Sequence, residues 1–190
     1  MAAKVKLENI LFENLPQIIG YIKSLGKDCS GAIERSKLYI AGYKRNLQTA
    51  STEKTVNKYT GEVESSDADD YRFYISQEES KISRLQSGLK YFYVLQGLLN
   101  DILNVQLKLH EVQEVVAWQS SAAYAAITRY DSDEAPEINY DDKIKEYETE
   151  LQALGEKCLQ CPEIVTCINF IIAEKQKKKT VATQTRVHRR

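Results

Sequence analysis

The feature that most constrains the fold is a long stretch, 71–131, in which apolar residues recur every three or four positions in two overlapping series. The first series consists of Ile82, Leu85, Leu89, Phe92 and Leu99, and the second of Leu95, Leu98, Ile102, Val105, Leu109, Val112 and Val116. Such spacings place side chains on one side of an α-helix. The sequence therefore predicts a helix over 71–131, about 90 Å long at 1.5 Å per residue.

A break in this helix is conceivable at 97–101, where a glycine precedes two residues that often cap helices. The apolar spacing runs through these positions without a shift in register, which favours an unbroken helix.

Where the two series overlap, the predicted helix is apolar around much of its circumference. Three consecutive aromatic residues at 91–93 spread over about 200° of the helix surface, because each residue turns by 100°. A helix of this kind needs partners on more than one side. We therefore expect a protein–protein interface formed by Tyr91, Phe92, Tyr93, Leu95, Leu98, Ile102 and Trp118.

Shorter periodic segments predict four more helices, at about 6–25, 30–50, 139–154 and 162–179. Pro16 suits only the start of a helix, so the first helix proper begins near Asn14 or Leu15, after a short lead-in turn.

Glycine and proline mark the other expected helix ends. Gly26 and Gly155 occupy positions typical of a C-terminal cap, and Asp28 or Ser30 would cap the next helix start. Pro162 falls at the preferred first position of the last helix.

The predicted fold class is all-α. We expect an elongated antiparallel bundle around one long central helix, forming a single domain over 1–179, with a flexible basic tail at 180–190. The first two helices would pack on the first half of the central helix, and the last two on its second half. Residues 51–70 are polar and acidic, so we expect an exposed loop there; a small hairpin around positions 59–61 is the alternative.

Charge is segregated along the chain although the net charge is only −1. Basic residues exceed acidic ones in 1–50 and 156–190, whereas acidic residues exceed basic ones in 51–70 and 132–155. Alternating blocks favour pairing within a chain or between copies over a uniform nucleic-acid-binding surface.

The basic C-terminal end has two interpretations. One is an arm that binds nucleic acid through Lys177, Lys178, Lys179, Arg186, Arg189 and Arg190. The other is a solubilising tail, or one that docks on the acidic 132–155 block of a neighbouring copy. No recognisable nucleic-acid-reading module accompanies the basic residues.

Three of the four cysteines lie close together, in the order Cys158-x2-Cys161-x5-Cys167. A metal site would need a fourth ligand, either Cys29 or His188, and a redox pair would be expected between a strand and a helix. The pattern therefore favours a helix–helix corner with structural thiols, and a metal or redox role remains the alternative.

The sequence lacks the usual catalytic sets. Two histidines, neither preceded by glutamate three positions earlier, do not build a di-iron bundle, and no phosphate-binding glycine loop occurs. We expect no enzyme activity, no cofactor and no small-molecule substrate.

The expected function is structural. The chain would assemble through helices, with itself or with a protein partner, for example in a virion- or phage-like particle. No secretory signal or membrane-spanning stretch is recognisable, so a cytoplasmic location, or one within an assembled particle, is expected.

Overall fold

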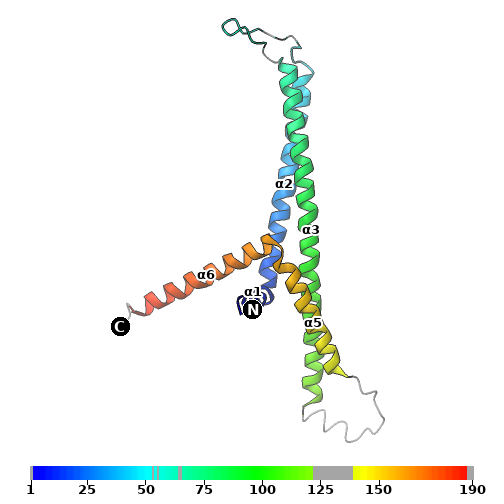
Figure 1. The fold of residues 1–190 in the computed structure, drawn as a ribbon, viewed down its shortest axis with the longest axis vertical. Coiled ribbons are helices and arrows are strands. Elements are labelled where there is room, and N and C mark those ends of the chain that lie inside the picture. Colours follow the sequence, from blue (N-terminus) through cyan, green and yellow to red (C-terminus); the bar gives the residue numbers. More distant parts are fainter. Residues whose placement is uncertain (1, 53, 55, 64–65, 122–138, 188–190) are drawn as a thin grey trace. The chain divides into compact units, whose positions relative to one another are not determined.

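The computed structural model describes residues 2–52, 54, 56–63, 66–121 and 139–187 of the chain. Over these residues the fold consists of helices, with no strand, as Figure 1 shows. The helices are α1 (Ala2–Glu13), α2 (Leu15–Leu47), α3 (Asp67–Gln119), α5 (Tyr140–Leu159) and α6 (Pro162–Val187). The predicted all-α fold class is confirmed.

The long central helix is also confirmed. α3 passes without a break through Gly97 and the two residues that could have capped a new helix. It begins four positions earlier than predicted and ends at Gln119, followed by a turn at Ser120 and Ser121. The last part of the prediction, at 122–131, lies outside the described residues.

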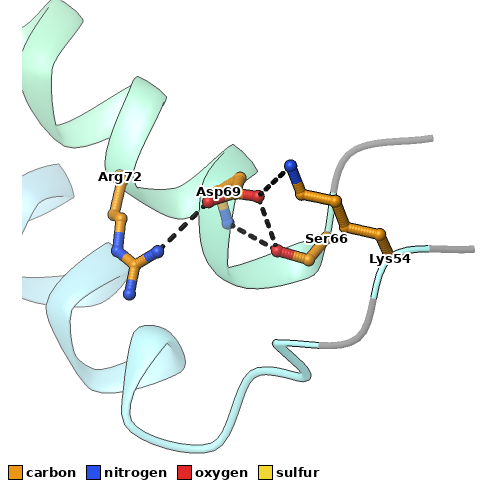
Figure 2. A network of polar contacts seen from close by, with 4 residues as sticks. All are labelled: Lys54, Ser66, Asp69 and Arg72. Atoms are coloured by element: carbon orange, nitrogen blue, oxygen red, sulfur yellow. Dashed lines mark hydrogen bonds and ion pairs between the residues drawn. The ribbon is translucent and has the colours of Figure 1, made fainter. Parts of the chain in front are cut away.

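The N-terminus of α3 is fixed by the residue that precedes it. The Ser66 hydroxyl accepts a hydrogen bond from the Asp69 backbone N–H at 3.2 Å and donates one to the Asp69 carboxylate at 2.9 Å. Arg72 and Lys54 pair with the same carboxylate at 3.1 and 3.9 Å (Figure 2). The Ser66 hydrogen bond and the two cations keep the pKa of Asp69 below its usual value. This capping network ends the loop at Ser66 and explains the early helix start.

The described residues between α2 and α3, at 48–52, 54, 56–63 and 66, form a loop rather than a regular hairpin, whereas the last residues of the loop predicted for 51–70, at 67–70, belong to α3. The described part of the loop contains one isolated antiparallel bridge, between Val56 and Val63. The turn between them needs a left-handed residue, which Gly61 supplies with φ of 70°.

The break between α1 and α2 lies where the sequence predicts it. α2 begins at Leu15, and Asn14 bridges the two helices by donating its side-chain N–H to the Ile10 carbonyl at 2.7 Å. Pro16 has no backbone N–H with which to continue α1. The predicted lead-in turn is wrong, however, because those residues form the helix α1.

Two predicted helix ends are wrong because both glycines lie inside helices. α2 continues through Gly26 and the proposed caps Asp28 and Ser30, and α5 continues through Gly155 to Leu159. Both glycines are buried. Glycine costs only about 1 kcal/mol in a helix interior, which packing of the surrounding apolar residues readily offsets.

The C-terminal prediction also needs correction. α6 begins at Pro162 as predicted, but it ends at Val187, so 180–187 are helical rather than a flexible tail. Lack of apolar periodicity shows only that a segment has no core-facing side. The interior of α6 after Pro162 has no glycine or proline to end the helix.

The chain forms two compact units, one of residues 23–94 and one of residues 1–22 with 95–190. We call them the hairpin unit and the terminal unit. α2 and α3 each contribute to both.

The terminal unit holds most of the large buried side chains. Its core consists of Leu11, Leu15, Ile18, Ile19, Ile22, Leu95, Leu99, Ile102, Val105, Leu151, Cys158, Ile164, Cys167, Ile168 and Ile171. α5 contacts both α1 and α6, and α1 contacts α6. The first segment thus shares a core with the second half of α3, whereas we predicted that it packs on the first half. α5 and α6 supply the apolar faces that α1 covers.

The contact between α1 and α5 is centred on Gly155. A Cβ at this position would lie 2.9 Å from Cζ of Phe12, closer than real Cβ contacts come. The absent side chain therefore lets the two helices approach with the Phe12 ring between them.

We predict opposite outcomes for two glycine-to-alanine substitutions in helix interiors. Gly20→Ala should raise the free energy of unfolding by about 0.5–1 kcal/mol, because nothing lies within 4 Å of the new Cβ. Gly155→Ala should not raise the free energy of unfolding, because the Phe12 ring must move to make room for the new Cβ. Chemical denaturation measures both. An equal gain at the two sites would contradict the close approach.

Candidate functional site

The hairpin unit pairs residues 23–47 of α2 with residues 67–94 of α3 in antiparallel register (Figure 1). Contacts recur at intervals of seven residues on each helix. Tyr43 contacts Tyr71, Ser36 lies at Glu78, and Cys29 lies at Leu85. We call these six residues the seam. Seven-residue spacing is the repeat that keeps one face of a helix directed at a neighbour over several turns.

The middle of the seam is polar. Ser36 is fully buried, and its hydroxyl makes no hydrogen bond of standard geometry with the described residues. The hydroxyl nevertheless lies near enough to Glu78 to be the main cause of a lowered pKa of that carboxyl. Lys81 adds to the effect, since its ammonium group donates to both carboxylate oxygens at 3.3 and 3.4 Å. The buried hydroxyl thus favours the ionised form of the carboxyl opposite it.

At one end of the seam, small residues allow the helices to come close. The Cys29 thiol donates to the Leu85 carbonyl at 3.1 Å, and a Cβ on Gly88 would lie 3.8 Å from the same sulfur. Cys29 is therefore used in packing two helices of the hairpin unit.

At the other end of the seam, aromatic rings gather and reach the surface. Tyr43 lies 5.5 Å from Tyr74, and Tyr74 lies 6.0 Å from Phe73, measured between ring centroids. Phe73 is 58% exposed and Tyr74 is 44% exposed. One turn before Tyr43 on α2, Tyr39 is 53% exposed. We call Tyr39, Tyr43, Phe73 and Tyr74 the aromatic surface, and it is our candidate functional site.

The apolar spacing of the sequence does not single out an interface here. Its signal was present in the aromatic residues at 39 and 43, one turn apart, and at 71, 73 and 74. Their apolar neighbours are less dense than those at 91–102, so apolar spacing alone points to the later segment. Only the antiparallel register brings the two groups together.

The predicted interface residues fall into two groups. Tyr91, Tyr93 and Trp118 are exposed, and Phe92 and Leu98 are half-buried. Leu95 and Ile102 are 2% and 0% exposed. These two side chains fill the core of the terminal unit, where the overlapping apolar series finds its partners within the same chain.

Two of the three cysteines near the corner between α5 and α6 are buried in the protein. Cys158 is fully buried, and burial, with a smaller contribution from Cys161, raises its pKa to about 12. Burial also raises the pKa of Cys167. Cys161 precedes Pro162, and its carbonyl accepts from Ile164 and Val165 at the start of α6.

The described part of the chain contains no cluster of three or more His, Cys, Asp or Glu side chains that could hold a metal ion. The four predicted ligands, Cys29, Cys158, Cys161 and Cys167, are all free thiols in this part, and Cys29 belongs to the other unit.

The basic residues of the predicted nucleic-acid site lie at the end of α6. Lys177 and Lys178 are exposed. Lys179 and Arg186 belong to the helix, but their side chains lie outside what the structure describes, as do Arg189 and Arg190 entirely.

Comparison with known proteins found no matching family model, no matching curated protein and no matching solved structure. In the described helices, no stretch is both long and apolar enough to cross a membrane.

We predict that the seam makes stability depend on acidity. The pKa of Glu78 is lower in the folded chain than its usual value of 4.5, so the stabilisation is present above that value and is lost as the pH falls through the folded pKa. Ser36→Ala should make the fall in unfolding free energy between about pH 5 and pH 3 shallower. Denaturation at several pH values measures this, with the exposed Ser80→Ala as control. If the unfolding free energy of Ser36→Ala falls with pH as steeply as that of the unchanged chain, Ser36 does not favour the ionised form of Glu78.

Thiol accessibility gives a second prediction. Cys158 and Cys167 should react with an alkylating agent at pH 8 about a hundredfold more slowly than Cys161, because they are buried and protonated. Mass spectrometry of timed samples assigns each site. In denaturant the three cysteines should react at equal rates. If they also react at equal rates in the native protein, the corner is not packed as described.

Proposed function

We propose that this chain is a non-enzymatic assembly protein that associates with itself through helix–helix contacts on the aromatic surface. The observation that carries the proposal is the exposure of Tyr39, Phe73 and Tyr74 beside a two-helix seam. Soluble chains expose single apolar residues routinely, but a group of adjacent exposed aromatic rings is typical of an interaction surface.

The packing of the hairpin unit supports the same function. Along the paired helices most apolar side chains are only half-buried, including Ile40, Leu47, Ile75, Ile82 and Leu89. Two helices alone cannot cover both flanks of such a seam. A third helix laid along it would bury these side chains together with the aromatic rings, as in coiled-coil bundles.

Tyrosine suits this role because its ring buries a large area and its hydroxyl tolerates water. Tyrosine and tryptophan contribute strongly to binding at protein interfaces. The chain has twelve tyrosines and one tryptophan, and Trp118 is a further exposed aromatic residue on α3.

The proposal predicts self-association that depends on the aromatic surface. Exchange of Tyr39→Ser and Phe73→Ser together should weaken association about tenfold or more, because residues at the centre of interfaces commonly contribute over 1 kcal/mol each. Sedimentation velocity over a concentration series, at high salt, measures the change. Circular dichroism checks that the helices remain.

A matched control removes apolar area elsewhere. Leu107→Ser with Val115→Ser changes two side chains of α3 in the terminal unit that are 53% and 39% exposed. This control should associate like the unchanged chain. A chain that stays monomeric at high micromolar concentration, or a control that weakens association equally, would contradict the proposal.

A further inference from the structure

A cavity of about 330 Å³ lies between α2 and α6 in the terminal unit. It is lined by Tyr21 of α2 and by Thr166, Cys167 and Phe170 of α6. We call it the α2–α6 cavity. Its volume falls at the lower end of the range of small-molecule sites in proteins, which is roughly 300–1,000 Å³. The cavity thus has room for a small molecule but not for a helix.

Helical geometry brings the lining residues of α6 to one side of the helix. Phe170 follows Thr166 by four positions and Cys167 by three, so the three are neighbours on the helix surface. On α2, Tyr21 follows the buried residue Ile18 by three positions. Cys167 is 4% exposed, whereas Tyr21 is 37% exposed and Phe170 is 61% exposed. The thiol therefore lies at the floor of the cavity, and the two rings lie at its opening to solvent.

The lining offers a ligand almost no polar or charged group. Among the described residues, no charged side chain lines the cavity. The Thr166 hydroxyl donates to the Pro162 carbonyl at 2.8 Å, so it already has a partner within its own helix. Burial raises the pKa of the Cys167 thiol, which is therefore uncharged at neutral pH. Ions and strongly polar molecules are disfavoured here, because burying a polar group without a hydrogen-bond partner is costly.

The two rings at the opening favour an aromatic ligand. In the part of the chain that the structure describes, neither Tyr21 nor Phe170 pairs with another aromatic ring. Aromatic rings attract one another in offset or edge-to-face arrangements, in addition to the area that they bury. An aromatic molecule in the cavity gains this attraction, whereas an aliphatic molecule of the same size gains burial alone.

We infer that the α2–α6 cavity binds a small uncharged aromatic molecule, of the size of one ring or two fused rings. Apolar cavities in protein interiors stay free of water and accept molecules such as benzene. The inference goes beyond self-association, because the aromatic surface belongs to the hairpin unit and the cavity to the terminal unit. A bound molecule contacts both α2 and α6 and thereby stabilises the terminal unit.

Toluene, added to the full chain up to its solubility in water, tests the inference. A ligand that binds only the folded chain raises the folding equilibrium constant by one plus the ratio of its concentration to Kd. At about ten times Kd this constant should rise about tenfold, and Tm should rise with it. Thermal unfolding followed by circular dichroism measures the rise. Benzoate has the same ring but carries a charge, so it should give no rise.

Alkylation of Cys167 shows whether toluene occupies the cavity. This thiol lines the cavity, so its reaction with methyl methanethiosulfonate should slow about tenfold at about ten times Kd. Cys161 does not line the cavity and should keep its rate, which shows that toluene leaves the reagent itself unchanged. Mass spectrometry of timed samples assigns the two sites.

Two variants that add a ring to α6 form a matched pair. Thr166→Phe adds the ring to the lining of the cavity, whereas Asn169→Phe adds it at an exposed position of the same helix outside the lining. The first variant should abolish both the rise in Tm and the protection of Cys167, because the added ring fills the cavity. The second variant should keep both effects. Circular dichroism without toluene checks that each variant folds.

A second pair of variants removes a ring, so that the test does not depend on the folding of Thr166→Phe. Phe170→Ala should raise the Kd for toluene about threefold or more, because one of the two rings at the opening is lost. Phe73→Ala removes a ring of similar exposure, 58% against 61%, from the hairpin unit. This control should leave the Kd for toluene unchanged.

Four results would overturn the inference. They are the absence of any toluene effect on Tm and Cys167, an equal rise in Tm with benzoate, equal toluene effects in Thr166→Phe and Asn169→Phe, and equal binding by Phe170→Ala and Phe73→Ala. If toluene has no effect but Thr166→Phe weakens self-association in sedimentation, the cavity instead receives a side chain of a second copy. Association through the aromatic surface is tested separately, by the substitutions at Tyr39 and Phe73.

Discussion

The hairpin unit depends on the antiparallel register between α2 and α3, and the contact that specifies it best is that of Ser36 with Glu78. A buried hydroxyl needs a polar neighbour, and in this register it faces a carboxylate held by Lys81. A slip by one heptad would place Ser36 opposite Tyr71 or Leu85 and leave it among apolar groups. Polar groups inside a helical seam commonly fix register in this manner, at some cost in stability.

The same register explains why the aromatic rings reach the surface. With Ser36 at Glu78, the bulky residues Tyr43, Tyr71 and Tyr74 meet at the end of the seam that is nearer the loop. Cys29 and Gly88 meet at the opposite end of the seam. Three rings exceed what two helices can enclose, so their edges and those of Phe73 and Tyr39 remain accessible.

The fold class and the long unbroken helix could be predicted from the sequence because apolar spacing of three and four residues is a local signal. The ends of helices could not all be predicted. Gly26 and Gly155 look like caps, but whether a glycine ends a helix or lets another helix approach depends on a partner distant in sequence, such as Phe12. The burial of Leu95 and Ile102 and the aromatic surface depend likewise on segments far apart in the chain.

Trp118 is the chain's one tryptophan, and it belongs to the terminal unit, whereas the ring contacts of Tyr43, Tyr71 and Tyr74 belong to the hairpin unit. The molecule thus carries two separate optical reporters. Tryptophan fluorescence follows the later part of α3, and the near-ultraviolet dichroism of the clustered tyrosines follows the hairpin. Unfolding recorded with both shows whether the continuous helices α2 and α3 make the two units melt as one cooperative body or one after the other.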